Sequence, residues 1–176
     1  PLFGKVLSSM GAGSLKEGEY AVGVFFLPSE GEGASKTRES IEREMNGHRL
    51  SMLGWRKVPV DTSALGEKAM EALPDIQHLL IARPEGWSSQ AFERQLFLVR
   101  RRIEQSWDKD GLKDCYIPSM SCRTISYKGL LVAPQHSRFY KYLEDPDCAS
   151  AIAVFDQRYS TNSVADWVRA QSCLFL

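Results

Sequence analysis

The chain has 176 residues, the length of a single domain that buries about 70% of its unfolded surface. Its 22 basic and 22 acidic residues cancel, so bulk charge predicts neither a nucleic-acid nor a membrane partner. No apolar run approaches the roughly 20 residues that span a bilayer, and the first residues lack the regions of a signal peptide. We therefore expect a globular protein that is not secreted.

Cysteines and histidines are scattered along the chain without the spacing of metal ligands. They are Cys115, Cys122, Cys148, Cys173, His48, His78 and His136. No two cysteines form a CxxC pair, and the histidines do not cluster with them, which argues against a zinc site. Scattered thiols in a chain of this length favour a reducing compartment over a disulfide framework.

The first elements in chain order are a loop, a strand and a helix. Residues 1–19 contain three glycines, and we expect a loop that leads into the domain. Residues 20–27, YAVGVFFL, are apolar nearly throughout, which predicts a strand inside a sheet that is covered on both faces. In residues 35–47, Ile41 and Met45 are four residues apart and charged residues cover the other face. The segment ends at Gly47, so we expect a helix there.

Residues 49–60 predict a kinked strand. Gly54 indicates a bulge or a close approach of two backbones, and Pro59 favours the edge of a sheet. Trp55 beside Arg56 could form a cation–π platform, but we favour the interpretation that Trp55 packs in the core.

The second half of the chain mixes strands and helices without regular βαβ units. We predict helices at 65–73, 88–107 and 135–143, and strands at 76–82, 116–117, 123–127 and 150–155. His78 falls in one of these strands, and we expect it to have a polar partner rather than to act as a catalytic base. The mixture indicates an α+β layered domain.

The end of the last predicted strand carries a candidate binding residue. An apolar run at 151–155 is followed by Asp156, Gln157 and Arg158, and then by the polar turn 159–162. The planar guanidinium of an arginine matches the geometry of a carboxylate. From these residues alone, Arg158 is either a carboxylate clamp or the partner of an acid at a strand end.

Several segments, taken in order, resemble the glutaminase domain of glutamate synthase, a class-II glutamine amidotransferase. They are Tyr20–Gly23 with Phe26–Pro28, Leu53–Arg56 with Val58–Asp61, Phe92–Arg94, Ser121–Gly129 (SCRTISYKG), and Arg158–Asn162 (RYSTN) with Trp167, Arg169 and Ala170. Each segment is short, but their order and spacing make the match specific over roughly residues 20–171.

The resemblance implies an N-terminal-nucleophile hydrolase fold, which is a four-layer αββα sandwich, with residues 20–176 forming a partial domain. It also implies hydrolysis of the side-chain amide of L-glutamine by an N-terminal cysteine whose α-amino group is the base. The ammonia is used elsewhere in the polypeptide to make glutamate from 2-oxoglutarate. FMN and an iron–sulfur cluster belong to that other region, and no cofactor is expected in this segment. The family implies a cytoplasmic or plastid location.

Carried over residue by residue, Arg158 matches the arginine that binds the α-carboxylate of glutamine, and Thr161 shapes the same pocket. No catalytic residue can be carried over. Residue 1 is Pro1, no cysteine precedes Cys115, and the chain ends before the Asn-Gly pair that forms the family's oxyanion hole. Asp156 stands where a histidine is common.

We therefore expect a domain that is incomplete at both ends and inactive alone. Its expected partners are L-glutamine and the remainder of a glutamate synthase polypeptide, with no nucleic acid and no membrane. One alternative is a non-catalytic binding or regulatory module with the same fold. Another is an unrelated enzyme that uses Pro1 or an internal cysteine.

Overall fold

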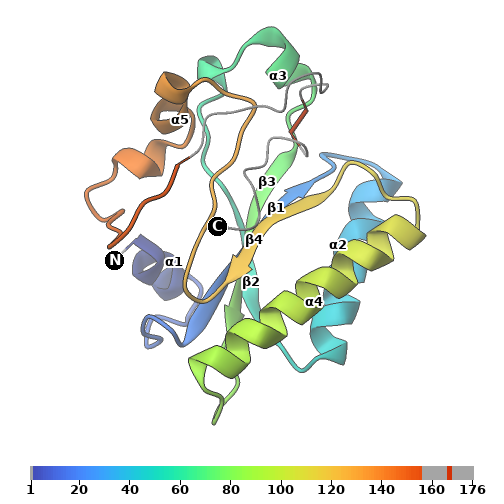
Figure 1. The fold of residues 1–176 in the computed structure, drawn as a ribbon, viewed down its shortest axis with the longest axis vertical. Coiled ribbons are helices and arrows are strands. Elements are labelled where there is room, and N and C mark those ends of the chain that lie inside the picture. Colours follow the sequence, from blue (N-terminus) through green and yellow to red (C-terminus); the bar gives the residue numbers. More distant parts are fainter. Residues whose placement is uncertain (1, 156–165, 168–176) are drawn as a thin grey trace.

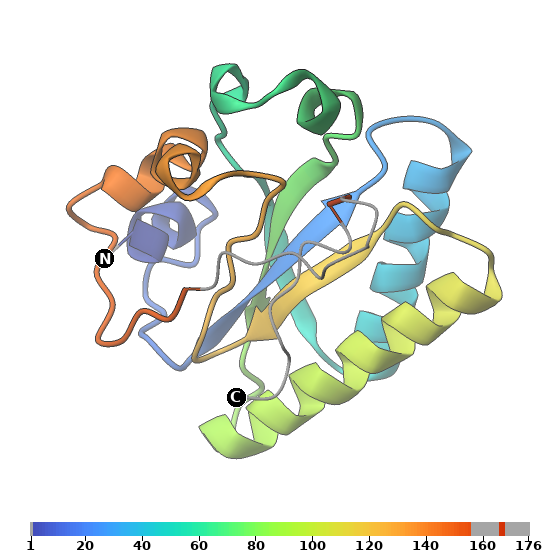
Figure 2. The same ribbon diagram turned by 45° about the horizontal axis from the view of Figure 1, so that its top comes forward.

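The structure, a computed structural model, describes residues 2–155, 166 and 167. A four-stranded antiparallel sheet of order β2-β3-β1-β4 lies between α2 and α4 on one side and α1, α3 and α5 on the other (Figures 1 and 2). The elements are α1 Leu2–Ser9, β1 Tyr20–Leu27, α2 Glu32–Gly47, β2 Ser51–Lys57, α3 Glu67–Glu71, β3 Asp75–Ala82, α4 Ser89–Lys109, β4 Tyr116–Ser121 and α5 Ala133–Phe139, with 3-10 turns at Thr62–Ala64 and Lys141–Glu144. The α+β class is thereby confirmed, and the described residues form one sheet of the expected sandwich.

Strand β1 lies inside the sheet because it is apolar on both of its faces. It pairs with β3 along its whole length and with β4 on its other side. Phe25 packs with α2 and α4, whereas the next residue, Phe26, packs in a second cluster on the opposite face. Both side chains are at most 1% exposed, as expected for a strand covered on both sides.

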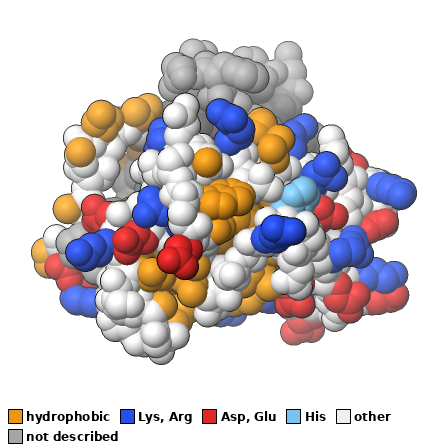
Figure 3. All heavy atoms as spheres, turned by 90° about the horizontal axis from the view of Figure 1, so that it is seen from below, with side chains coloured by type: hydrophobic (Ala, Val, Ile, Leu, Met, Phe, Trp, Pro, Cys, Tyr) orange, Lys and Arg blue, Asp and Glu red, His pale blue; other side chains and the backbone are white. Residues whose placement is uncertain are grey.

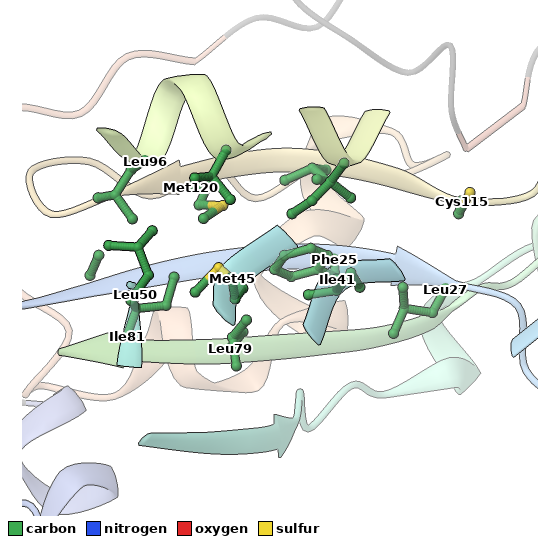
Figure 4. Packing of buried hydrophobic residues seen from close by; sticks show 14 of the residues in the cluster. Phe25, Leu27, Ile41, Met45, Leu50, Leu79, Ile81, Leu96, Cys115 and Met120 are labelled. Atoms are coloured by element: carbon green, nitrogen blue, oxygen red, sulfur yellow. The ribbon is translucent and has the colours of Figure 1, made fainter. Parts of the chain in front are cut away.

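The face covered by α2 and α4, called the helical face below, is a continuous apolar core. Ile41 and Met45 of α2 and Leu96 of α4 gather there with sheet residues that include Phe25 and Leu79 (Figure 4). Helix α4 contributes a buried stripe at helical spacing, made of Phe92, Leu96, Val99, Ile103 and Trp107. The start of α4 is capped by the Ser88 hydroxyl, which accepts a hydrogen bond from the amide of Ala91.

Strand β2 is an edge strand and carries the predicted kink. Its register with β3 shifts between Met52 and Gly54, and Gly54 has a φ of 156°. A Cβ atom at this position would lie 3.4 Å from the Met10 sulfur, so the bulge also brings the backbone close to another segment. Trp55 packs edge-on against Phe25 and also stacks under a cation, which comes from Arg38 rather than from its neighbour in sequence.

Three predicted regions differ from the structure. The first is residues 1–19, predicted as a loop, in which Leu2–Ser9 forms helix α1. Leu7 of this helix is fully buried, and Phe3 packs against the ring of His78. The spacing of Phe3, Val6 and Leu7 is helical, and the glycines that follow obscured this signal.

The second region is β4 and the segment after it. One strand, Tyr116–Ser121, replaces the predicted pair, and it runs through Pro118. An edge strand tolerates proline because one side of its backbone needs no partner. Residues 123–127, predicted as a strand, form no regular structure. Side-chain hydroxyls satisfy backbone amides there, since Ser119 Oγ accepts a hydrogen bond from the amide of Ser126.

The third region is the predicted strand at residues 150–155, which has no regular structure. Its large side chains are exposed instead of buried: Ile152 by 80%, Val154 by 75% and Phe155 by 83%. An apolar run predicts a strand only where a neighbouring strand can pair with it, and none of the described strands does so.

The surface mixes charges of both signs. Seen from below, basic and acidic side chains are interspersed around a group of hydrophobic side chains in the middle of the face (Figure 3). Within the described ranges, no helix combines the length and the hydrophobicity that a membrane crossing requires.

Candidate functional site

The two predicted ligand residues, Arg158 and Thr161, lie outside the described residues, as does Asp156. The structure instead describes the surface to which the chain returns after this segment. We call it the tyrosine face, because Tyr127, Tyr140 and Tyr142 pack on the side of the sheet opposite α2 and α4. Helix α5 and the 3-10 turn Lys141–Glu144 bring two of these tyrosines to the sheet.

Trp167 anchors the chain on this face. It is 3% exposed, and its indole N–H donates a hydrogen bond of 3.0 Å to the carbonyl of Ala69 in α3. The ring packs edge-on against Phe26 of β1 at 5.8 Å and at a tilt against Phe139 of α5 at 5.7 Å. A tryptophan that is both buried and hydrogen-bonded holds its backbone firmly. The segment that carries Arg158 and Thr161 therefore ends at a fixed point.

Trp167 also meets the end of the segment 121–129. A Cβ atom on Gly129 would lie 3.3 Å from the indole and 2.5 Å from the Leu131 side chain, so a larger residue would require that side chain to shift. Two of the segments that carry the family resemblance thus converge at one place, although about 40 residues separate them in sequence.

The beginning of segment 121–129 is held by one carboxylate from α4. Glu93 accepts hydrogen bonds from the Ser121 hydroxyl at 2.6 Å and from the Cys122 amide at 2.9 Å. The same hydroxyl accepts hydrogen bonds from the amides of Arg123 and Thr124. Charge-assisted hydrogen bonds of this kind are stronger than neutral ones, so Glu93 fixes the path of the loop as it leaves β4.

The far end of the segment is held by the tyrosines. The Tyr140 hydroxyl donates a hydrogen bond of 2.6 Å to the carbonyl of Lys128. The Lys128 ammonium donates to the Tyr116 hydroxyl at 3.2 Å and lies over the Tyr116 ring. Burial, together with the nearby charge of Arg100, lowers the pKa of Lys128 to about 8.

Burial also shifts the pKa values of the tyrosines. It raises the pKa of Tyr127 to about 12, and it raises those of Tyr140 and Tyr142 above the ordinary range. All three hydroxyls therefore stay protonated near neutral pH and can act as hydrogen-bond donors rather than as bases.

His78 of β3 lies in the middle of the tyrosine face and is fully buried. Burial, and secondly the charge of Arg56, lowers its pKa to about 3, so the ring is neutral. Its Nδ1 is 3.4 Å from a guanidinium nitrogen of Arg56, which is the polar partner expected from the sequence. Its Nε2 has no hydrogen-bond partner among the described residues. A ring with so low a pKa is a poor general base near neutral pH.

The described cysteines are not activated thiols. Burial raises the pKa of Cys115 to about 12, and burial with the adjacent Glu93 carboxylate raises that of Cys122 to about 11. The pKa of Cys148 is also raised, mainly by burial. Since the thiolate is the nucleophile, none of these three is suited to attack an amide. In the part of the chain that the structure covers, no group of His, Cys, Asp and Glu side chains could hold a metal ion.

The described residues of this face therefore form a packed surface without an activated nucleophile. Its parts are the loop 121–129, the buried Trp167 and the tyrosine cluster. The sequence singled out the loop, but it did not connect Arg56, His78 and Tyr142. That connection needed the pairing of β2 with β3, which no local pattern reveals.

Comparison with known proteins gives a family match and several relatives. The family model described as glutamine amidotransferases class-II matches residues 1–176. The chain is 37% identical to the glutamate synthase [NADPH] large chain of Azospirillum brasilense over 156 residues, which are 88% of this chain and 10% of that protein.

Two further relatives bear similar names. Identity is 37% over 150 residues with ferredoxin-dependent glutamate synthase 2 of Synechocystis sp., covering 85% of this chain and 9% of that protein. It is 34% over 160 residues with the chloroplastic/mitochondrial ferredoxin-dependent glutamate synthase 1 of Arabidopsis thaliana, covering 88% and 10%. The chain thus spans about a tenth of the length of the curated relatives it matches.

Proposed function

Because this chain belongs to the class-II glutamine amidotransferases, we propose that it works as part of the glutaminase domain of a glutamate synthase and binds L-glutamine there. The observation that carries the proposal is the family match over all 176 residues, together with relatives that are named glutamate synthases. The convergence of the loop 121–129 with Trp167 supports it, because the segment just before Trp167 contains the proposed ligand residues.

In this proposal Arg158 binds the α-carboxylate of glutamine through two parallel hydrogen bonds, and Thr161 shapes the pocket around the substrate. The side-chain amide is hydrolysed to glutamate and ammonia. The ammonia then serves glutamate synthesis from 2-oxoglutarate in another region of the polypeptide, which carries FMN and an iron–sulfur cluster. We place the protein in the cytoplasm or a plastid, in keeping with bacterial and chloroplastic relatives.

The nucleophile in this proposal is none of the three described cysteines, because their raised pKa values keep them protonated. The chain then supplies substrate recognition and scaffold, and it does not hydrolyse glutamine when isolated. The raised pKa values of these thiols also favour a second candidate function. In it, the chain is a non-catalytic module of the same fold that binds glutamine without cleaving it.

The test compares two nitrogen donors in the full-length polypeptide that contains this sequence. Glutamate formation is measured with L-glutamine and, separately, with ammonium. Lysine cannot form the bidentate contact, so Arg158→Lys should reduce kcat/KM for glutamine about tenfold or more and leave the ammonium reaction unchanged. The matched control is Arg102→Lys on the exposed side of α4, which should affect neither reaction.

Equal loss with both donors would contradict the assigned role of Arg158, and so would an unchanged glutamine reaction. The second candidate function would be favoured if the wild-type polypeptide bound glutamine but released no ammonia.

A further inference from the structure

Arg56 is held in an unusual setting on the tyrosine face. It lies on β2 directly opposite His78 of β3, and its guanidinium is 3.4 Å from the Nδ1 atom of that histidine. The guanidinium carbon also lies 5.7 Å from the centre of the Tyr142 ring. Two contacts thus orient the side chain, one to a ring nitrogen and one to an aromatic face.

The contact with His78 fixes the direction of the hydrogen bond. A guanidinium can only donate, so Nδ1 must accept and the ring proton must sit on Nε2. The ring is fully buried between Phe3, Tyr127 and Tyr142, whose centroids lie 5.5, 6.4 and 6.1 Å away. Burial keeps this histidine neutral, and a neutral ring is what allows it to accept from a cation.

The charge of Arg56 has no acidic partner in the described part of the chain. It takes part in no ion pair among the described residues, whereas other cations near this face do, such as Lys5 with Asp147 and Lys141 with Asp61. The side chain is half-buried, so part of its hydration is lost. A cation that is partly removed from water is costly unless an anion accompanies it.

The donors of Arg56 that have no partner among the described residues indicate which chemical group fits there. A guanidinium has five N–H donors in a planar fork, and His78 uses one of them. Two parallel N–H groups on one edge match the two oxygens of a carboxylate better than any other common group in proteins.

We propose that Arg56 binds a carboxylate, with His78 and Tyr142 as its positioning residues, in addition to the carboxylate site assigned to Arg158. The carboxylate belongs either to a free amino acid or to an acidic side chain elsewhere in the parent polypeptide. This inference does not depend on glutaminase activity, because it rests on the contacts of Arg56 alone.

The experiment measures how fast phenylglyoxal modifies Arg56, using mass spectrometry of peptides from the 176-residue chain. Sodium acetate is the first probe, compared with sodium chloride at equal ionic strength. Modification of Arg56 should slow about tenfold once acetate reaches ten times its dissociation constant. The exposed Arg102 in the same sample is the internal control, and its rate should not change.

Two variants test the positioning residues. His78→Leu keeps the charge of Arg56 but removes the acceptor, so protection by acetate should require a several-fold higher concentration. Tyr142→Leu should have the same effect in smaller measure, since it removes only the aromatic contact. Equal protection in wild type and both variants would overturn the role given to these two residues.

The full-length polypeptide separates the two sources of the carboxylate. If an acidic side chain occupies the site, Arg56 should react slowly there even without acetate. If a free amino acid occupies it, Arg56 should react quickly and be protected by L-glutamate. The proposal is overturned if neither acetate nor L-glutamate slows the modification of Arg56 relative to that of Arg102, and if Arg56 reacts equally fast in both proteins.

Discussion

The two faces of the sheet are built from different chemistry. On the helical face, the buried stripe of α4 meets apolar strand residues, and the polar contact of that stripe is the indole of Trp107 donating to the Ser40 hydroxyl. On the tyrosine face, Tyr140, Tyr142 and a neutral histidine are buried, and Tyr127 and two cations, Arg56 and Lys128, are half-buried. The first arrangement stabilises the fold. The second includes polar groups, such as His78 Nε2, that have no hydrogen-bond partner among the described residues, which costs stability.

Neighbouring residues of α4 connect the two roles. Phe92 is fully buried in the helical core, whereas the next residue, Glu93, reaches Ser121 and Cys122 at the start of the loop 121–129. A change at Phe92 should therefore affect the helical core, and a change at Glu93 should affect the loop 121–129.

The largest effect is expected for Phe92→Ala. Removing a fully buried phenylalanine leaves a cavity, and it should lower the free energy of unfolding by about 3–5 kcal/mol. Urea denaturation followed by circular dichroism measures this loss. A change below about 1 kcal/mol would show that the helical face is not the main source of stability.

A smaller effect on stability is expected for Glu93→Gln, which keeps the shape of the side chain but weakens its charged hydrogen bonds. The free energy of unfolding should fall by about 1–3 kcal/mol. Proteolysis should become faster within residues 121–129 rather than throughout the chain, because the loop loses its anchor. Uniformly faster proteolysis would indicate that Glu93 supports the fold as a whole.

The smallest effect concerns His78 and pH. Its pKa is about 3 in the folded chain and about 6.5 when unfolded, so the unfolded chain gains a proton between these values and the folded chain does not. Stability should thus fall as pH falls below 6.5, by at most about 1.4 kcal/mol per pH unit from this group. His78→Phe should flatten the decline between pH 6.5 and 5, measured by thermal unfolding. Tyr142→Phe, the control, should show the same decline as wild type. If the stability of His78→Phe fell with pH as steeply as that of wild type, the burial of a neutral His78 ring would be contradicted.

Much of the fold could be predicted from the sequence. The apolar run of β1, the helical period of α4 and the bulge at Gly54 are local signals, and the structure confirms each. The resemblance to the glutaminase domain of glutamate synthase is confirmed by the family match, because it depended on ordered segments rather than on any one motif.

The sequence-based predictions were wrong where tertiary contacts determine the local structure. Residues 123–127 have strand-forming side chains, but the Ser119 and Ser121 hydroxyls capture their backbone amides. The run at 151–155 is apolar, but none of the described strands lies beside it. The pairing of Arg56 with His78 depends on strand register, which composition does not determine. The roles of Arg158 and Thr161 stay predictions, because these residues lie outside the described chain.

In the proposed function, Arg158 binds the α-carboxylate of L-glutamine. Isothermal calorimetry of L-glutamine with the full-length polypeptide tests it most directly, comparing wild type with Arg158→Lys and with Arg102→Lys as the control. We predict that Arg158→Lys weakens binding about tenfold or more while the control binds as wild type does. Equal affinity in all three proteins would contradict the claim and leave Arg158 as a structural ion-pair partner.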